Sequence, residues 1–319
     1  MKILVTGAAG FIGFNFCNYL LSINKSIKVC GIDNVNNYYD VKLKRKRLSI
    51  LKKYKNFKFH KININDQKKL NKIFKLNKFD FVFNLAAQAG VRYSIDHPRK
   101  YVETNIVGFY NVIENSTKYK VKRLFYASSS SVYGENQNFP LKEKEKINPK
   151  NIYGLSKKIN EEISQIFQRY YKLKSTGLRF FTVFGEWGRP DMMMMKYIES
   201  HYKKKVFQLN NFGNHTRDFT YIGDVVKILY LLVKNNSKLK SMDVLNICSN
   251  KPVKLDKIIE LMRKRNIKPS IKKASLQKAD ILKTHGSNSK ILKITKFKKF
   301  EKIDEALNKT INWYRENYL

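Results

Sequence analysis

The stretch that decides the fold opens the chain, where residues 2–23 read KILVTGAAGFIGFNFCNYLLSI. Residues 2–6 are a short apolar run, which predicts a strand buried on both faces, and residues 11–23 have helical spacing. Between them, Gly7 allows a tight turn, Gly10 lets the backbone approach a pyrophosphate, and Gly13 lets helix and strand pack closely. The N–H groups of the helix N-terminus then face the phosphates. The stretch therefore predicts a dinucleotide site.

Strand and helix patterns alternate through the first half of the chain. We expect further strands at residues 27–32, 57–62, 79–85, 123–128 and 175–180, and helices at 66–76, 99–119 and 153–172. This alternation predicts an α/β fold with a Rossmann-like, doubly wound parallel sheet.

The rhythm breaks after residue 181, where Gly185, Gly188 and Pro190 mark a loop, and the chain ends in an amphipathic helix at 303–318. We expect a dinucleotide-binding domain over residues 1–175 and a smaller, mixed α/β substrate domain over 176–319. A helix at 221–233 predicts that the chain returns to the first domain near residues 218–240.

The charge of the chain is strongly positive, with 64 Lys and Arg against 25 Asp and Glu among 319 residues, a formal +39. Such a surface attracts nucleic acid or anionic membranes. The excess is mostly Lys and comes with abundant Asn, which indicates genome composition rather than an Arg-rich phosphate-binding face. The densest run, Lys42 to Arg47, is interspersed with leucines and predicts a helix with a solvated basic face. We expect no nucleic-acid partner, and a basic nucleic-acid-binding module remains the alternative.

Several classes of protein are disfavoured by composition. No apolar run reaches the roughly 18 residues of a membrane span, so we expect no membrane insertion. The cysteines Cys17, Cys30 and Cys248 lack metal-ligand spacing and are too few for a disulfide framework. The sequence predicts a cytoplasmic protein without a bound metal.

Asp33 lies about 20 residues beyond Gly13, at the end of the second predicted strand. An acidic side chain there accepts hydrogen bonds from an adenosine ribose and repels a 2′-phosphate. Residues 34–37 offer no Lys or Arg to hold that phosphate. NAD is therefore preferred over NADP, although Asp33 could instead be a turn or capping residue.

Tyr153 and Lys157 are spaced by four residues, which places them on one face of a predicted helix. A nearby ammonium favours the phenolate and lowers the pKa of a tyrosine that removes a proton from substrate. Residues 127–131, ASSSS, end the fifth strand, and ligands of such sheets bind at the carboxyl ends of strands. The serine run could alternatively be a plain loop.

At these residues the chain resembles the extended short-chain dehydrogenase/reductases, specifically the nucleotide-sugar 4-epimerases. The likeness covers nearly the whole length in the segments GAAGFIG (7–13), NLAAQAGVRYS (84–94), YASSSSVYG (126–134), YGLSK (153–157) and RDFTYIGD (217–224). Two further segments, NNYYDVKLKRKRL (36–48) and GLRFFTVFGEWGRPDM (177–192), are similar to the UDP-glucuronate 4-epimerase branch.

The resemblance implies roles for particular residues. Tyr153 would be the catalytic base, Lys157 its cationic partner, and Ser129 the hydroxyl on the sugar O4. It implies NAD contacts from Gly7, Gly10, Phe11, Ile12, Gly13, Asp33, Asn34, Asn63, Ile64, Leu85, Ala86, Ala87, Asn105, Tyr153 and Lys157. It implies substrate contacts from Ser128, Ser129, Ser130, Thr182, Arg189, Arg217 and Asp280. Asn63 replaces the acidic residue that the family uses on adenine, and Asn105 resembles an Asn that supports the active-site helix.

The implied reaction is NAD-dependent 4-epimerisation of a UDP-hexuronic acid, UDP-glucuronate to UDP-galacturonate, through a 4-keto sugar. Alternatives are epimerisation of UDP-glucose or UDP-N-acetylglucosamine, decarboxylation of UDP-glucuronate, or a non-catalytic NAD-binding sensor. Two roles are open for Arg189. If the substrate is a uronate, its guanidinium holds the sugar carboxylate, helped by Thr182. In the other, Arg189 is a surface residue paired with Glu186 or Asp191. We also expect a homodimer.

Overall fold

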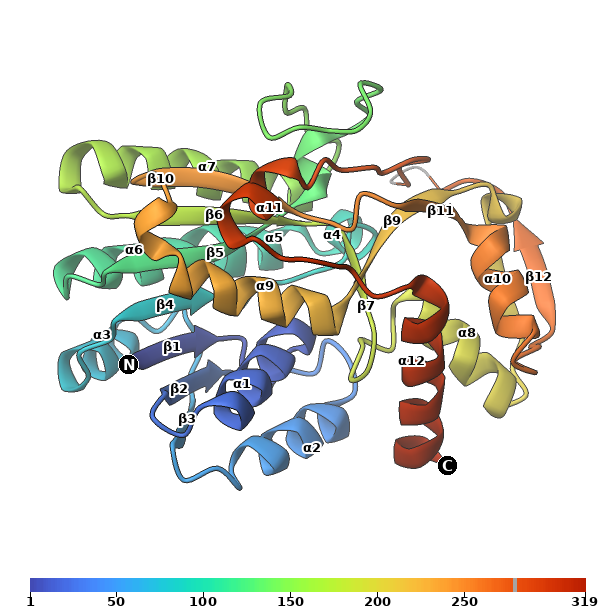
Figure 1. The fold of residues 1–319 in the computed structure, drawn as a ribbon, viewed down its shortest axis with the longest axis horizontal. Coiled ribbons are helices and arrows are strands. Elements are labelled where there is room, and N and C mark those ends of the chain that lie inside the picture. Colours follow the sequence, from blue (N-terminus) through green and yellow to red (C-terminus); the bar gives the residue numbers. More distant parts are fainter. Residues whose placement is uncertain (278–279) are drawn as a thin grey trace.

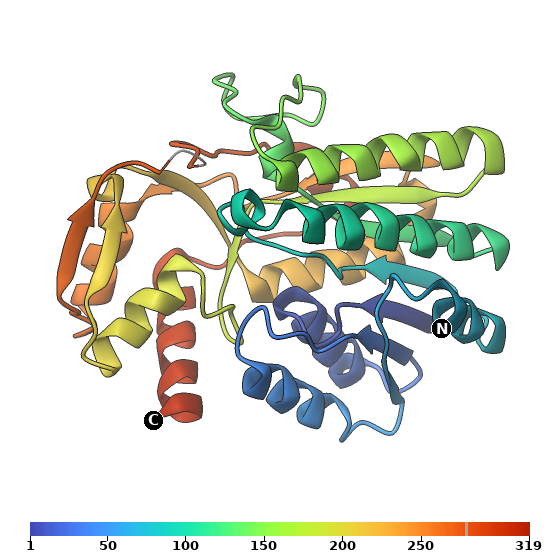
Figure 2. The ribbon, with the colours of Figure 1, turned by 180° about the vertical axis from the view of Figure 1, so that it is seen from behind.

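The computed structural model describes residues 1–277 and 280–319. Its centre is a parallel sheet between two layers of helices (Figures 1 and 2). Within the described residues seven strands form this sheet, in the order β10-β6-β5-β4-β1-β2-β3 with every neighbouring pair parallel. The strands are β1 (Lys2–Thr6), β2 (Lys28–Asp33), β3 (Phe57–Lys61), β4 (Phe81–Asn84), β5 (Arg123–Ser129), β6 (Ser175–Phe180) and β10 (Met242–Ile247).

The strand order reverses at β1, which pairs with β2 on one side and with β4 on the other. Ligands of doubly wound sheets bind beyond the carboxyl ends of the strands at such a reversal. The predicted Rossmann-like fold is therefore confirmed, and its topology places a binding site after β1, β2 and β4.

One face of the sheet is covered by α1 (Phe11–Ile23), α2 (Val41–Leu51), α9 (Ile222–Lys234) and α11 (Ser289–Thr295), which lie in front in Figure 1. Apolar side chains of α1 and α9, such as Phe14, Leu20, Val225 and Leu229, are buried together against the sheet. The helix expected at 221–233 does return to this layer.

The opposite face carries α3 (Gln67–Leu76), α6 (Gly108–Lys118) and α7 (Ile152–Tyr171), which Figure 2 shows from the front. Their buried side chains, among them Leu70, Phe74, Phe109 and Val112, meet Leu124 of β5. Two apolar layers thus explain why the central strands are nearly continuous runs of hydrophobic residues.

A second, smaller group of elements lies beyond the carboxyl ends of the central strands, on the right in Figure 1. It contains two small sheets, formed by β7 (Thr182–Phe184), β9 (Thr216–Tyr221) and β11 (Pro252–Lys254), and by β8 (Phe207–Asn210) and β12 (Ile271–Ala274). Helices α8 (Met193–Tyr202), α10 (Leu255–Arg263) and α12 (Ile303–Tyr318) pack around a core of their own.

The helix expected over residues 99–119 is broken. The structure has α4 (Tyr93–Asp96), α5 (Pro98–Tyr101), the π-helical η1 (Val102–Val107) and then α6. Pro98 stands at the first turn of α5, where its missing N–H costs nothing. The wide π turn carries Asn105, which is 1% exposed and bonds outside the helix. Short 3₁₀ turns are η2 (Ser130–Tyr133), η3 (Asn211–Gly213) and η4 (Asn236–Lys238). In the described residues, no helix is both long and apolar enough to cross a membrane.

Candidate active site

A cavity of about 240 Å³ opens beyond the carboxyl ends of the central strands. Most of the residues predicted to bind the dinucleotide or to act on substrate share its walls. The cavity is lined by Gly7, Gly10, Phe11, Ile12, Gly13, Asp33, Asn34, Asn63, Ile64, Leu85, Ala86, Ala87, Ser128, Ser129, Tyr153, Lys157 and Arg189, with further residues that include Tyr38, Tyr39, Lys44, Gln88, Thr104 and Met192.

The glycine-rich turn is shaped by close backbone contacts. Gly7 has a φ of +73°, and a Cβ on it would lie 2.7 Å from the Ala86 nitrogen, so only glycine fits between β1 and the segment after β4. The Gly10 N–H donates to the Gly7 carbonyl at 2.9 Å, and α1 begins directly afterwards at Phe11. The free N–H groups at the start of α1 therefore lie beside the cavity, where phosphates are stabilised.

Asp33 ends β2 with both carboxylate oxygens engaged by the backbone. It accepts from the Ala9 N–H at 3.0 Å and from the Val35 N–H at 2.7 Å. The carboxylate is thereby held at the cavity wall beside Asn34, where a ribose diol can donate to its remaining lone pairs. Farther along the wall, the Asn63 side-chain oxygen accepts from the Asn65 N–H at 3.1 Å and retains capacity for a second donor.

The interpretation of residues 42–47 as a solvated basic face is wrong at two positions. α2 forms as predicted, but Lys44 is 5% exposed and Arg47 is fully buried. Lys44 Nζ donates to the carbonyl and side-chain oxygens of Asn36 at 2.8 and 2.6 Å, and lies 4.4 Å from the centre of the Tyr39 ring. Burial lowers the pKa of Lys44 and the nearby Asp33 charge opposes that shift. The signal was present in the sequence, because positions 43, 44, 47, 48 and 51 form one helical stripe.

Arg47 links the glycine-rich turn to the loop after β7. Its guanidinium donates to the carbonyl of Ala9 at 2.8 Å and to the hydroxyl of Tyr39 at 2.7 Å. On its other side it donates to the carbonyls of Trp187 and Gly188. Within residues 1–277 and 280–319 Arg47 pairs with no carboxylate; its terminal nitrogens donate to backbone oxygens and the Tyr39 hydroxyl, while its Nε has no partner there. These bonds tie the glycine-rich turn to the loop after β7.

The position of Asp33 predicts which dinucleotide copurifies with the protein. Because its carboxylate faces the ribose position and would repel a 2′-phosphate, we expect NAD to be released on denaturation, with little NADP. Lys44 does not reverse this expectation, since its ammonium is engaged by Asn36. The released nucleotide is identified by liquid chromatography of the acid extract. Recovery of mainly NADP would contradict the role given to Asp33.

Tyr153 and Lys157 face the cavity from the first turns of α7. The helix is capped by the Asn151 side chain, which accepts from the Gly154 N–H. Lys157 is 2% exposed, and its Nζ lies 5.9 Å from the centre of the Tyr153 ring. Burial lowers the pKa of Lys157 to about 7. Burial also raises the pKa of Tyr153, while the neighbouring Ser129 hydroxyl and the Arg189 charge act in the opposite direction. The phenol therefore needs a nearby cation to ionise.

The structure distinguishes the candidate serines. The Ser128 hydroxyl donates to Glu161 of α7 at 2.6 Å and is committed to that bond. The Ser129 hydroxyl accepts from the Ser131 N–H at 3.2 Å and lies at the cavity beside Tyr153. Ser130 begins η2 and does not line the cavity. Ser129 is thus the hydroxyl best placed to work with the phenol.

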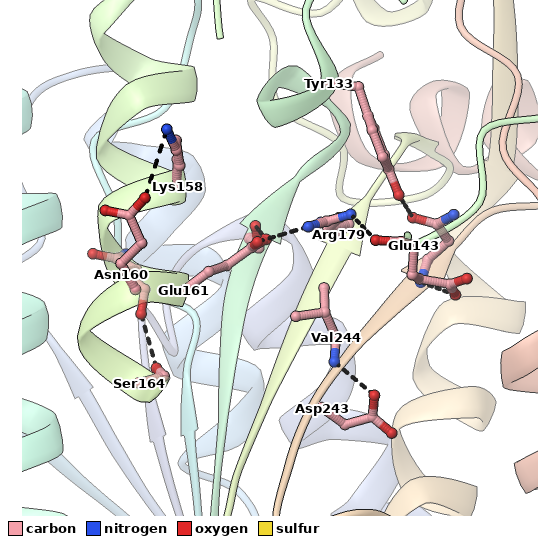
Figure 3. Close-up of polar contacts among 12 residues, drawn as sticks. Tyr133, Glu143, Lys158, Asn160, Glu161, Ser164, Arg179, Asp243 and Val244 are labelled. Atoms are coloured by element: carbon pink, nitrogen blue, oxygen red, sulfur yellow. Dashed lines mark hydrogen bonds and ion pairs between the residues drawn. The ribbon is translucent and has the colours of Figure 1, made fainter. Parts of the chain in front are cut away.

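Behind the serines lies a buried ion pair, shown in Figure 3. Arg179 of β6 binds Glu161 through two parallel bonds of 2.9 and 2.7 Å, and each side chain is 4% exposed. Arg179 also donates to the Glu143 carbonyl at 3.0 Å and lies over the Tyr133 ring. This pair links β6 to α7, and Glu161 also accepts from the Ser128 hydroxyl of β5, so that this hydroxyl is engaged within the protein.

Arg189 lies at the cavity wall and is also paired with an acidic neighbour. Its Nε and one terminal nitrogen donate to the two oxygens of Asp191 at 3.0 and 2.6 Å. The pairing with Asp191 expected of Arg189 is therefore present, and its contact with a sugar carboxylate stays a prediction. Glu186 is engaged elsewhere, accepting from the Tyr221 hydroxyl at 2.8 Å.

Five predicted residues lie outside the cavity lining. Asn105 binds the backbone of Gln88 and the Ser156 hydroxyl, so it supports the site from behind. Thr182 lines a small neighbouring cavity of about 30 Å³. Ser130 lies in η2, as described above. Arg217 donates to the Leu282 carbonyl, and Asp280 pairs with Arg92. In the described residues, no group of three or more His, Cys, Asp and Glu side chains could hold a metal ion.

The chemistry of the cavity follows from its two halves. One half presents helix N–H groups and a carboxylate to a dinucleotide, and the other half holds a phenol, an ammonium and a hydroxyl together. The phenol, the ammonium and the hydroxyl can together remove or return the proton of a substrate hydroxyl group. A bound dinucleotide can at the same time exchange a hydride with the carbon that bears this hydroxyl. The fold and the site define an enzyme of the short-chain dehydrogenase/reductase class.

Residues 3–248 match the NAD dependent epimerase/dehydratase family, and the chain belongs to this family. A UDP-glucuronate 4-epimerase of Thermodesulfobacterium geofontis is 38% identical over 318 residues, covering 98% of this chain and 96% of the relative.

Solved structures agree with this assignment. UDP-glucuronic acid 4-epimerase from Bacillus cereus, in complex with UDP-glucuronic acid and NAD, matches all of both chains with a TM-score of 0.93 at 28% identity. A Thermotoga maritima UDP-glucose 4-epimerase with UDP-glucose matches all of both chains with a TM-score of 0.88, also at 28% identity.

Proposed function

We propose that this enzyme interconverts UDP-glucuronate and UDP-galacturonate by NAD-dependent inversion at C4 of the sugar. The observation that carries the proposal is Arg189, a guanidinium that lines the same cavity as Tyr153 and Lys157. A planar cation beside the proton-transfer groups suits a sugar carboxylate. The 38% identity to a UDP-glucuronate 4-epimerase supports the same substrate.

NAD suits the residues that line the cavity. The space over Gly7 that a Cβ would fill, the helix N-terminus and the fixed Asp33 carboxylate match its phosphates and adenosine ribose. When bound, NAD supplies a reversible acceptor for the C4 hydride. Lys157, with its ammonium at the cavity, would hold the second ribose and the phenol in register.

The chain's own residues handle the proton of the O4 hydroxyl. Tyr153 takes this proton as phenolate and returns it when the C4 configuration has been inverted, so the phenol is unchanged after each cycle. Lys157 favours the phenolate by its charge. Ser129 binds O4 and keeps it within reach of the phenol.

Replacement of Arg189 by Ala tests the assignment to a uronate. Charge-assisted bonds of about 1.5–3 kcal/mol correspond to roughly 10–150-fold discrimination, so we expect kcat/KM for UDP-glucuronate to fall at least about tenfold. The kcat/KM or the Kd for UDP-glucose should change little, because its neutral CH₂OH group cannot form charge-assisted bonds to the guanidinium. A loosely held carboxylate also lets the 4-keto sugar lose CO₂, so a UDP-pentose should appear.

The matched control is Arg99→Ala, which removes an exposed Arg from a surface ion pair with Glu103 and should leave both sugars unaffected. Equal losses for the two sugars in Arg189→Ala would mean that Arg189 serves the diphosphate or the fold. In that case UDP-glucose or UDP-N-acetylglucosamine becomes the better candidate. Products are resolved by NMR for each UDP-sugar.

The proposal extends to assembly. Large apolar side chains on α6 and α7 are exposed, with Tyr110 at 44%, Ile166 at 47% and Tyr170 at 67%. Neighbouring helices that carry such residues favour a second copy as partner, so we propose a homodimer formed through α6 and α7.

Location, pathway and chain division follow the same proposal. The three cysteines are buried and free, which suits the reducing cytoplasm. A UDP-uronate product would feed polysaccharide biosynthesis, because a UDP leaving group activates the sugar for transfer. We propose a division into residues 1–175 for NAD and mainly 176–319 for the UDP-sugar, with a return near 218–240; β6, β10 and α11 also lie in the central sheet and its helical layer.

A further inference from the structure

Asp191 already occupies some of the hydrogen-bond donors of Arg189, the residue to which the proposed function assigns the sugar carboxylate. Its two oxygens take the Nε edge of Arg189 at 3.0 and 2.6 Å. The Tyr38 hydroxyl also donates to Asp191, at 3.3 Å. Arg189 and Tyr38 line the cavity, whereas Asp191 is not among the lining residues.

The other edge of the guanidinium is left for a ligand. An arginine has five N–H donors, and the Asp191 pair uses the Nε edge alone. The second terminal nitrogen of Arg189 makes no hydrogen bond to residues 1–277 or 280–319. With one edge fixed by a carboxylate, the planar group has one orientation in which its remaining donors can meet a second carboxylate.

The surroundings explain why Arg189 needs such a partner. Arg47 and Lys44 are both buried nearby, and the charge of Arg189 contributes to lowering the pKa of Lys44. Lys44 and Arg189 line the cavity, Arg47 lies near Lys44, and these like charges repel one another. Asp191 offsets this repulsion at Arg189, and the Arg189 charge in turn holds the pKa of Asp191 below its usual range.

We infer that Asp191 is a positioning residue for uronate recognition: it holds Arg189 by one edge so that the opposite edge meets the sugar carboxylate. This inference rests on the proposed role of Arg189. Asp191 acts through Arg189 and does not itself touch substrate. The competing arrangement is that Asp191 occupies the place of the sugar carboxylate and must be displaced by it.

The two arrangements predict opposite changes in affinity. Binding is measured by calorimetry on the Tyr153→Phe chain loaded with NAD, so that turnover does not obscure it. With Asp191→Ala added, we expect the Kd for UDP-glucuronate to rise about tenfold and the Kd for UDP-glucose to change less than twofold. Asp191→Asn keeps the shape and one acceptor oxygen, so its Kd should lie in between. A lower Kd for UDP-glucuronate would establish displacement and overturn the inference.

A double substitution separates positioning from general support of the loop. If Asp191 acts only through Arg189, adding Asp191→Ala to Arg189→Ala should change the Kd for UDP-glucuronate less than twofold. A further loss for both sugars would show that Asp191 stabilises the loop itself, which overturns the inference. Asp304→Ala is the matched control, since Asp304 of α12 pairs with Arg265 and is not part of the cavity lining.

Product analysis with Tyr153 intact gives a second readout. In Asp191→Ala the carboxylate of the 4-keto sugar is less firmly oriented. Its C5–C6 bond can then break, the electron pair entering the ketone as an enolate, CO₂ leaving, and a proton from water adding at C5. The immediate product is a UDP-4-ketopentose, and return of the hydride removed earlier from C4 converts it to a UDP-pentose. Either product should form in Asp191→Ala and be absent from Asp304→Ala.

The outcomes also separate this inference from the function beneath it. If the wild-type enzyme does not turn over UDP-glucuronate, or if Arg189→Ala loses both sugars equally, the proposed function fails. If Arg189→Ala behaves as expected while Asp191→Ala and Asp191→Asn bind and react as wild type, the inference about Asp191 fails alone.

Discussion

Replacing Tyr153 by Phe is expected to lower the turnover of UDP-glucuronate by about 10²–10⁴-fold, the usual contribution of a general base. The change removes the hydroxyl that accepts the O4 proton and keeps the ring, which packs edge to face with Tyr101 at 6.1 Å. NAD content and the affinity for UDP-sugar should therefore persist. Turnover is followed by NMR of the sugar anomeric signals.

The matched control for this prediction is Tyr170→Phe on the same helix, where the side chain is 67% exposed and far along α7 from the cavity. Its turnover should equal that of the wild type. Near-normal turnover in Tyr153→Phe would assign the proton transfer to another group, and Ser129 would be the first to examine.

The second large effect concerns stability. Glu161→Gln preserves shape but removes the charge that pairs with Arg179 in a site where both side chains are 4% exposed. Breaking one partner of a buried ion pair leaves an uncompensated charge, so the free energy of unfolding should fall by about 3–5 kcal/mol. Urea denaturation followed by circular dichroism measures this loss.

The neighbouring residue supplies an exact chemical control. Glu162→Gln removes a carboxylate that is 57% exposed and lies 3.6 Å from Lys158, a surface pair worth at most about 1 kcal/mol. Replacing Glu161 and Arg179 together by apolar residues should recover part of the lost stability, because no buried charge then remains. Equal small losses for Glu161 and Glu162 would show that water reaches the Glu161–Arg179 pair.

The periodicity of hydrophobic residues predicts most of the fold. Continuous apolar runs located β1 to β6 of the central sheet, since both faces are covered by helices, and β6 (175–180) and α12 (303–318) begin and end where predicted. The strand β10 (242–247), which pairs with β6, was not predicted. The helix at 99–119 was not predictable in detail. Its register is interrupted where Asn105 turns to bind Gln88 and Ser156, which are distant in the sequence.

The dinucleotide half of the site was predictable because its residues lie in short motifs at strand ends, as Gly7 and Asp33 do. What sequence could not supply was the direction of single side chains. Ser128 and Ser129 are neighbours, and only the position of Glu161 tells that the Ser128 hydroxyl is engaged by α7, while the Ser129 hydroxyl contacts Ser131 at the cavity. The pairing of Arg189 with Asp191 likewise depends on the path of a loop.

The way in which Arg47 is satisfied has a consequence for how the substrate range of such an enzyme can change. Arg47 holds the carbonyls of Ala9, Trp187 and Gly188, which every amino acid possesses. Arg47 therefore binds the loop after β7 to the glycine-rich turn through main-chain atoms, whatever side chains the loop carries. Side chains of this loop, such as Arg189, can be substituted while Arg47 keeps the main chain in place. Arg47 therefore allows the substrate specificity to change without a change of fold.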